Sequence, residues 1–267
     1  MKAPDCGVHH DVPFDVYQSW EVAASASQLN LFANSPAHYK FGYKPPTKAM
    51  DIGTVIHSVV LEGTIDSYAV VPEYHLEDGN VDSKGKPSQS KATTWYKDKV
   101  KTFALAHSDQ AIISQETYDA KGVLKAIQDH PSARDLLTGG EPEVSMVWRD
   151  ETTGLLCKGR VDMLHDKRFV DLKTTASCTS FNIGAYGYHR QMAFYMQGLK
   201  AITGQSYTPY IVACEKAPPY GVMAAALSLH AMVTGHEECL DLLEQLSGCI
   251  FTDDWPCYED PIEWGLE

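Results

Sequence analysis

The stretch that decides the fold is "VDMLHDKRFVDLKTT", residues 161–175. It contains two apolar runs separated by a short polar break, and each run carries one aspartate, Asp162 or Asp171. Lys173 follows the second aspartate by two positions. A carboxylate within a buried strand is costly unless something compensates its charge. Either a structural salt bridge or a metal ion has to provide that compensation.

Around this stretch, the pattern of apolar residues predicts three antiparallel strands across residues 143–175. The turn ETTG, residues 151–154, separates the first two strands, and HDK, residues 165–167, separates the last two. Side chains alternate between the two faces of a strand, so Asp171 and Lys173 are expected on one face.

Further charged residues belong to the same strands. Asp162 lies on the strand next to Asp171, and Arg160 shares its face if that strand is regular. Glu143 opens the preceding strand. We therefore expect two or three carboxylates and the Lys173 ammonium to converge on one patch of the sheet.

Such a patch has a specific chemical meaning. Carboxylates this close repel one another and cannot all stay ionised near neutral pH. A divalent Mg²⁺ or Mn²⁺ ion resolves the conflict, because hard cations prefer oxygen ligands. Lys173 is then a candidate to hold or deprotonate a water beside the ion. For the D-x-K pattern alone, a purely structural Lys–Asp pair stays open as the alternative.

The rest of the chain predicts one α/β domain with a helical N-terminal part. Residues 1–24 are expected to form an N-terminal arm, loose over its first 15 residues, and residues 76–92 a mobile loop. Ser27 is a candidate N-cap for the first helix. Helices are expected at residues 25–41, 51–63, 93–107, 115–137, 185–202 and 235–247, and further strands at 210–216 and 222–229.

The composition is that of an ordinary globular protein of 267 residues, 44% hydrophobic and 21% charged. Its apolar runs are too short to span a membrane, and the N-terminus lacks the apolar core of a signal peptide. Seven cysteines without a C-x-x-C pair argue against a disulfide framework or a zinc ribbon. We therefore expect a cytoplasmic protein.

The net charge of −13 is unevenly distributed. Residues 217–267 hold ten Asp and Glu and no Lys or Arg, so residues 1–216 carry 22 basic against 25 acidic groups. Lysines crowd residues 84–101 and 40–48. The total charge therefore does not exclude a polyanion such as DNA, although solvated surface lysines explain the pattern equally well.

A set of short motifs follows in a recognisable order: G-x-x-x-H at 53–57, Glu143, Asp162, D-x-K at 171–173 and Q-x-x-x-Y at 191–195. This order resembles the RecB-like branch of the PD-(D/E)xK nucleases. The flanking words "GTVIHSVVLEG", "VDLKTT" and "QMAFYMQGL" resemble the RecE-type phage recombination exonucleases, functional relatives of lambda exonuclease.

The resemblance, over residues 25–230, implies a restriction-endonuclease-like fold with a central mixed sheet flanked by helices. It implies a single nuclease domain over residues 1–267, with the catalytic sheet and helix at 143–230.

The resemblance also assigns a role to each matching residue. Asp162, Asp171 and the Leu172 backbone carbonyl would ligate one Mg²⁺. His57 and Glu143 would complete or adjoin a second metal position, and Mn²⁺ would substitute for Mg²⁺.

By the same resemblance, Lys173 would orient and activate the attacking water. Gln191 and Tyr195 would support the site and the DNA near the scissile phosphate. Ser27 falls where lambda-type enzymes have a residue of a 5′-phosphate pocket, and Arg160 is a further candidate for DNA contact. A lysine with an ordinary pKa of about 10.4 would favour alkaline conditions.

The implied activity is Mg²⁺-dependent 5′→3′ degradation of one strand of linear double-stranded DNA to 5′-mononucleotides, which leaves 3′ overhangs. The implied partner is the single-strand annealing protein of a phage or prophage recombination system in a bacterial host. Related enzymes form rings around DNA, with a trimer favoured here over a tetramer.

Two alternatives remain. One is a Cas4-like or restriction-type nuclease of different polarity or with endonuclease activity. The other is a DNA-binding scaffold without catalysis, against which the intact Asp162, Asp171 and Lys173 argue.

Overall fold

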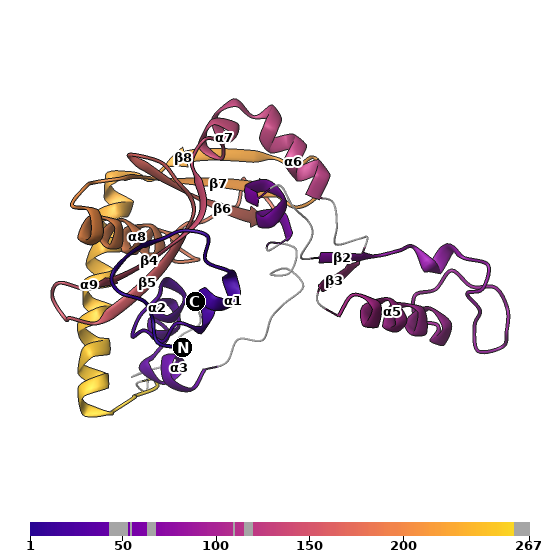
Figure 1. Ribbon diagram of the computed structural model, residues 1–267, viewed down its shortest axis with the longest axis horizontal. Helices are drawn as coiled ribbons and strands as arrows, with labels where there is room; N and C mark the ends of the chain where they lie inside the picture. The colour runs from indigo at the N-terminus through magenta and orange to yellow at the C-terminus, as the bar shows by residue number, and fades with distance from the viewer. Residues whose placement is uncertain (43–52, 54, 63–67, 109, 115–119, 259–267) are drawn as a thin grey trace, which may run out of the picture.

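The structure, a computed structural model, describes residues 1–42, 53, 55–62, 68–108, 110–114 and 120–258. Within these residues, a mixed β-sheet of six strands in the order β1-β4-β5-β6-β7-β8 forms the centre (Figure 1). The strands are β1 (Gly7–His9), β4 (Glu141–Arg149), β5 (Leu156–Leu164), β6 (Arg168–Thr175), β7 (Thr208–Glu215) and β8 (Val222–Ala226).

The sheet is mixed because its connections differ in length. Short turns join β4, β5 and β6, which are antiparallel as expected. β7 is parallel to β6, since helix α8 (Tyr188–Thr203) carries the chain back between them. β8 and β1 add antiparallel to β7 and β4. The expected α/β fold with a mixed sheet is confirmed.

Helices cover both faces of this sheet (Figure 1). α2, α8 and α9 share one core with Trp148, Val161 and Phe169 of the strands. α6, α7 and η1 share the other core with Val170 and Leu172. The helical segments are α1 (Phe14–Ser19), α2 (Ala26–Phe32), α3 (Pro36–Phe41), η1 (Ser58–Glu62), η2 (Tyr74–Leu76), α5 (Thr94–Ala106), α6 (Ala120–Asp129), α7 (Pro131–Leu136), α8 and α9 (Leu229–Thr252). None of the described helices is long and apolar enough to cross a membrane.

Several helices begin or end elsewhere than expected. The helix expected at 25–41 is two helices, because Ser35 and Pro36 start α3 afresh. Ser25 caps α2, since its side chain accepts a hydrogen bond from the Gln28 backbone N–H, so the prediction of Ser27 as N-cap is wrong.

The remaining helices show the same kind of difference. Pro131 divides the expected segment 115–137 into α6 and α7, and residues 115–119 lie outside the described residues. α9 begins six residues before 235, where Ser228 caps it. The expected helix 51–63 lies partly outside the described residues, and its described residues, 53 and 55–62, are helical.

The N-terminal segment is not the loose arm that was expected. β1 pairs with β4, and the side chain of Trp20 is buried. The Lys158 ammonium on β5 donates to the backbone carbonyls of Tyr17, Gln18 and Trp20 at 2.9, 3.1 and 2.8 Å. A buried lysine therefore fastens the end of α1 to the sheet, a long-range contact that composition does not reveal.

The described part of residues 68–114 projects from the sheet (Figure 1). Its parallel strands β2 (Tyr68–Val71) and β3 (Ala111–Ser114) are connected through η2 and α5. Residues 77–92 between η2 and α5 are irregular, as expected, and the Asn80 side chain hydrogen-bonds to Ser90 and Thr93. The mobility of this loop stays a prediction.

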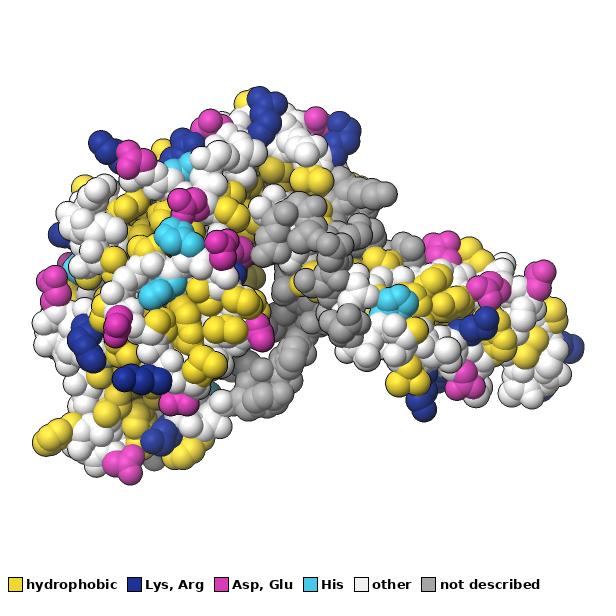
Figure 2. Space-filling view, viewed as in Figure 1, with side chains coloured by type: hydrophobic (Ala, Val, Ile, Leu, Met, Phe, Trp, Pro, Cys, Tyr) yellow, Lys and Arg dark blue, Asp and Glu magenta, His cyan; other side chains and the backbone are white. Residues whose placement is uncertain are grey.

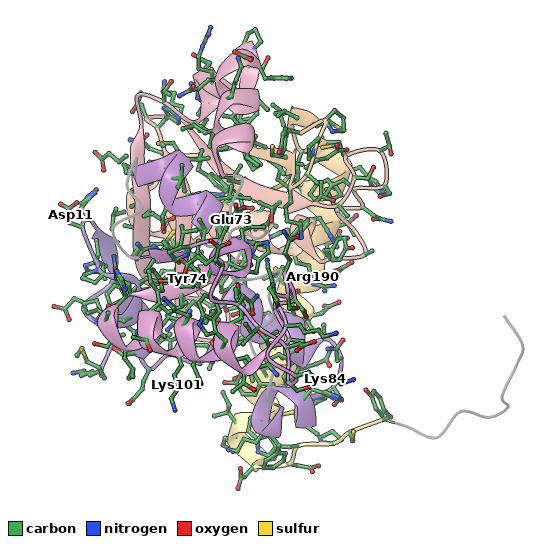
Figure 3. All side chains as sticks on the ribbon, turned by 90° about the vertical axis from the view of Figure 1, so that its right-hand side faces the viewer. Asp11, Glu73, Tyr74, Lys84, Lys101 and Arg190 are labelled. Atoms are coloured by element: carbon green, nitrogen blue, oxygen red, sulfur yellow. The ribbon has the colours of Figure 1, made fainter. Side chains whose placement is uncertain are left out.

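The projecting unit carries charges of both signs (Figure 2). Lys84 and Lys101 lie exposed on its surface (Figure 3). Lys99 is paired with Glu77 at 3.5 Å. The unit is therefore mixed in charge, and the lysine-rich stretch does not form a purely basic surface.

Candidate active site

Three potential ligand residues converge beside the centre of the sheet. His57 precedes η1, Glu143 lies on β4 and Asp162 lies on β5. Each places an imidazole nitrogen or a carboxylate oxygen within 4.8 Å of the other two. His57 Nδ1 lies 3.6 Å from Asp162 Oδ2. Residues far apart in sequence thus form one compact acidic cluster, which we call the His57–Glu143–Asp162 cluster.

The cluster lies where two strands separate. β5 and β6 pair only through two residue pairs next to their turn. Beyond these pairs, the Asp162 carboxylate accepts a hydrogen bond from the Leu172 backbone N–H at 2.6 Å. An unpaired buried N–H would be costly, so this carboxylate takes the place of a missing strand partner. The gap between the strands, and not a flat sheet face, brings the acidic groups together.

A second group of side chains meets on the α8 side of β6. Lys173 Nζ lies 2.5 Å from Asp171 Oδ2, as expected for residues two apart on one strand. The Gln191 side-chain amide donates to Asp171 Oδ1 at 2.8 Å and contacts the Tyr195 hydroxyl at 3.2 Å. Both oxygens of Asp171 are therefore in contact with this group. Asp171 is not part of the His57–Glu143–Asp162 cluster, and the expectation that it shares a metal ion with Asp162 stays a prediction.

Glu143 is held in an unusual conformation. Its φ of +53° lies in the left-handed region, which residues other than glycine rarely adopt. Arg160 Nε donates to its Oε2 at 2.5 Å, and Arg160 Nη1 donates to the Val12 carbonyl at 2.8 Å. Arg160 thus connects the acidic cluster to the N-terminal segment, so it positions Glu143 as well as adding positive charge.

Burial and mutual repulsion set the protonation of the cluster. Burial, with the Asp171 charge next in size, raises the pKa of Asp162 to about 8. Burial and the Asp162 charge raise the pKa of Glu143, although Arg160 opposes them. Burial and the Lys173 ammonium lower the pKa of His57. The imidazole is therefore neutral near pH 7. The positive charges of Lys173 and Arg160 do not fully offset the negative charge of the Asp162 and Glu143 carboxylates.

This donor set fits a hard divalent cation. Carboxylate oxygens and a neutral imidazole nitrogen are ligands that Mg²⁺ and Mn²⁺ accept. A cation beside the two carboxylates would supply the positive charge that Lys173 and Arg160 leave lacking. The Leu172 backbone forms a hydrogen bond with His57. The Leu172 carbonyl is therefore close to the cluster and stays a candidate ligand. The expectation of two ions stays a prediction.

The environment of Lys173 corrects one expectation. Burial alone would lower the pKa of this lysine, but the carboxylates of Asp171 and Asp162 outweigh it, and the pKa is raised. An ammonium held in this way is a poor proton acceptor. Lys173 is therefore suited to donate hydrogen bonds and positive charge, and its activation of the attacking water stays a prediction.

Tyr188 belongs to this site, and the sequence analysis missed it. Lys173 Nζ lies 4.9 Å from the centre of its ring. Tyr188 precedes Gln191 by three and Tyr195 by seven positions, so helical spacing could have placed it on the same face.

Ser27 lies apart from these contacts. It is exposed, and its hydroxyl lies 3.2 Å from that of Ser25. Its role in a 5′-phosphate pocket stays a prediction.

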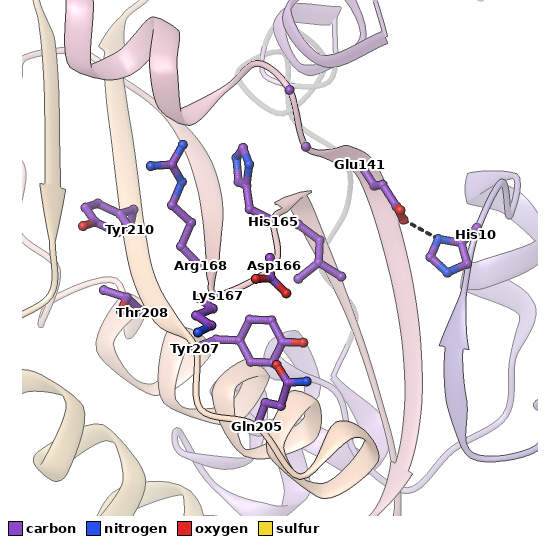
Figure 4. A pocket seen from close by; sticks show the side chains of 13 residues that line it. His10, Glu141, His165, Asp166, Lys167, Arg168, Gln205, Tyr207, Thr208 and Tyr210 are labelled. Atoms are coloured by element: carbon purple, nitrogen blue, oxygen red, sulfur yellow. Dashed lines mark ion pairs between the residues drawn. The ribbon is translucent and has the colours of Figure 1, made fainter.

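A separate cavity of about 930 Å³ opens near the β5–β6 turn (Figure 4). His165, Arg168 and Tyr210 line it, and an ion pair between His10 and Glu141 of 2.7 Å lies at its rim. None of the cluster residues lines this cavity, so its size does not locate the chemistry.

A mixed sheet flanked by helices, with acidic residues and a D-x-K lysine where two strands separate, is the arrangement of a PDDEXK-like domain. Residues 25–264 match the family described as PDDEXK-like domain of unknown function (DUF3799), and the chain belongs to this family.

A comparison with solved structures supports the fold in one case. The chain is similar to a candidate exonuclease from Eubacterium rectale, with a TM-score of 0.58 and 15% identity over 96% of this chain and 97% of that one. An alkaline exonuclease from Laribacter hongkongensis, LHK-Exo, matches with a TM-score of 0.26 and 15% identity over 72% of this chain and 94% of that one. No curated protein sequence matches.

Proposed function

We propose that this protein is a Mg²⁺-dependent exonuclease that degrades one strand of linear double-stranded DNA in the 5′→3′ direction. The observation that carries the proposal is the His57–Glu143–Asp162 cluster, whose ligand atoms lie within 4.8 Å of one another beside the paired Lys173 and Asp171. An acidic cluster of this kind can hold a divalent cation. Such a cation would supply the concentrated positive charge that phosphodiester hydrolysis needs at the phosphate.

The chain's own residues have separate tasks in this reaction. A bound divalent ion would supply Lewis acidity and stabilise the charge that develops on phosphate oxygens. His57, Glu143 and Asp162 would hold it. The Lys173 ammonium would donate hydrogen bonds that orient the attacking water and offset negative charge.

Two further residues keep the reacting groups in place. Gln191 fixes Asp171 through the hydrogen bond of 2.8 Å. Arg160 fixes Glu143 on the other side. Groups that are already oriented lower the cost of reaching the transition state.

The biological setting is proposed from the resemblance of the sequence motifs to RecE-type phage recombination exonucleases. The enzyme would act in the cytoplasm of a bacterial host, release 5′-mononucleotides and leave a 3′ strand for a single-strand annealing protein. A homo-oligomeric ring, with a trimer favoured, would encircle the DNA, and contacts with phosphates would make binding sensitive to salt.

The test uses linear duplex DNA labelled at one 5′ end, with Mg²⁺ at about pH 8. Wild type is compared with Lys173→Ala and with Lys125→Ala, which removes an exposed lysine on α6 that is paired with Asp129. We expect early release of labelled mononucleotide by wild type and Lys125→Ala, a loss of at least about 100-fold in Lys173→Ala, and no activity in EDTA.

Other outcomes point to the alternatives. Cleavage of covalently closed circles would replace the exonuclease by an endonuclease on the same fold. Late release of the 5′ label from linear DNA would reverse the polarity. A Lys173→Ala variant as active as wild type would show that the site assignment is wrong.

A further inference from the structure

Three aromatic rings form a continuous stack beside Lys173. The ring of Tyr188 lies 4.9 Å from Lys173 Nζ. Phe181 stacks against Tyr188 with ring centres 5.4 Å apart and planes at 23°. Tyr186 stacks against the same ring at 5.5 Å and 28°. Tyr188 is therefore the ring shared by both stacking pairs and the one that contacts Lys173, and Tyr186 is the exposed ring of the group.

Tyr186 is placed for contact with something outside the protein. It is 61% exposed, although one side of its ring is covered by Tyr188. A partner that covers such an exposed aromatic ring gains free energy by removing it from water. Since Tyr188 contacts Lys173, whatever lies on Tyr186 also lies next to the site.

The backbone around Tyr186 is fixed in advance. The Asn182 side chain accepts hydrogen bonds from the Gly184 and Ala185 N–H groups at 2.9 and 3.0 Å. Gly187 has a φ of +66°, and a Cβ there would lie 2.6 Å from Asn30 Oδ1. Few residues other than glycine could take this position. The ring therefore projects from a rigid turn at the start of α8.

We propose that Tyr186 is a stacking platform for an unpaired nucleobase at the end of the DNA strand that enters the site, an inference that rests on the proposed function. Every nucleobase has a flat aromatic face, so stacking on a tyrosine requires no particular sequence. An enzyme that removes successive nucleotides needs such tolerance. Tyr186 stacks on Tyr188, which contacts Lys173. A strand whose phosphate lies at Lys173 can therefore place its terminal base on the exposed Tyr186 ring, whatever the sequence.

The experiment measures stacking and turnover separately. Duplex DNA carries 2-aminopurine, whose fluorescence falls on stacking, as an unpaired nucleotide at the 5′ or the 3′ end, and binding is recorded in EDTA to prevent cleavage. KM and kcat for degradation are measured with Mg²⁺. The proteins are wild type, Tyr186→Ala, Tyr186→Phe and, as a control, Phe251→Ala, which removes an aromatic ring that is 91% exposed on α9.

We expect wild type, Tyr186→Phe and Phe251→Ala to quench the terminal probe and to share one KM. Tyr186→Ala should lose the quenching and raise KM about tenfold, or about 1.4 kcal/mol, with little change in kcat. Quenching and KM unchanged in Tyr186→Ala would overturn the platform. So would a Tyr186→Phe variant as defective as Tyr186→Ala, because the hydroxyl and not the ring would then matter. A wild type that degrades no DNA would instead refute the proposed function.

Discussion

Replacing Asp162 by asparagine is expected to stabilise the metal-free protein at alkaline pH and to abolish its nuclease activity. Asp162 is 8% exposed, and burial raises its pKa from 3.8 to about 8. Between these two values, the folded state binds the proton more tightly than the unfolded state does. The free energy of unfolding therefore falls as the pH rises through this window, and the effect is absent below it.

The size of the effect follows from the pKa. Each pKa unit corresponds to about 1.36 kcal/mol, so ionising Asp162 in the folded protein costs on the order of 6 kcal/mol. Relaxation of neighbouring groups reduces such penalties, and we expect a measured gain of about 2–5 kcal/mol for Asp162→Asn at pH 9. The asparagine stays neutral, and its carbonyl can still accept the Leu172 N–H.

The assay is urea unfolding in EDTA at pH 5, 7 and 9 for wild type and Asp162→Asn. The control is Asp129→Asn on α6, whose side chain is 65% exposed and should change stability by less than about 0.5 kcal/mol at every pH. Added Mg²⁺ should raise the Tm of wild type more than that of Asp162→Asn. An Asp162→Asn variant that is no more stable than wild type at pH 9, or whose gain does not grow with pH, would refute the reasoning.

The remaining predictions concern packing. Lys158→Met should lower the free energy of unfolding by about 2–4 kcal/mol, because three carbonyls, two of them in buried hydrogen bonds, lose their donor. Chymotrypsin should then cleave faster within residues 1–24, and unchanged cleavage would contradict the fastening role. Gly198→Ala should cost about 1–3 kcal/mol in thermal unfolding, since its Cβ would lie 2.8 Å from the Trp148 ring. Gly248→Ala, in the open part of α9, should instead add about 0.5–1 kcal/mol, and equal effects in the two variants would argue against this packing.

Several structural features of this protein follow from the sequence alone. The three strands across 143–175 follow from local apolar patterns and turn residues, which act over a few positions. The alternation of side chains places Lys173 and Asp171 together, and helical spacing places Gln191 beside Tyr195. The order of the motifs indicates the PDDEXK-like family, which the match over residues 25–264 confirms.

Only the tertiary structure decided how the acidic residues meet. The separation of β5 and β6 turns Asp162 into a hydrogen-bond acceptor for Leu172 and brings it to His57 and Glu143. The N-terminal segment is ordered by Lys158, 141 positions from Tyr17 in sequence. Local patterns do not encode such contacts, because they depend on which surfaces pack when the whole chain folds. The raised pKa of Asp162 has the same origin, since only burial beside Asp171 makes its charge costly.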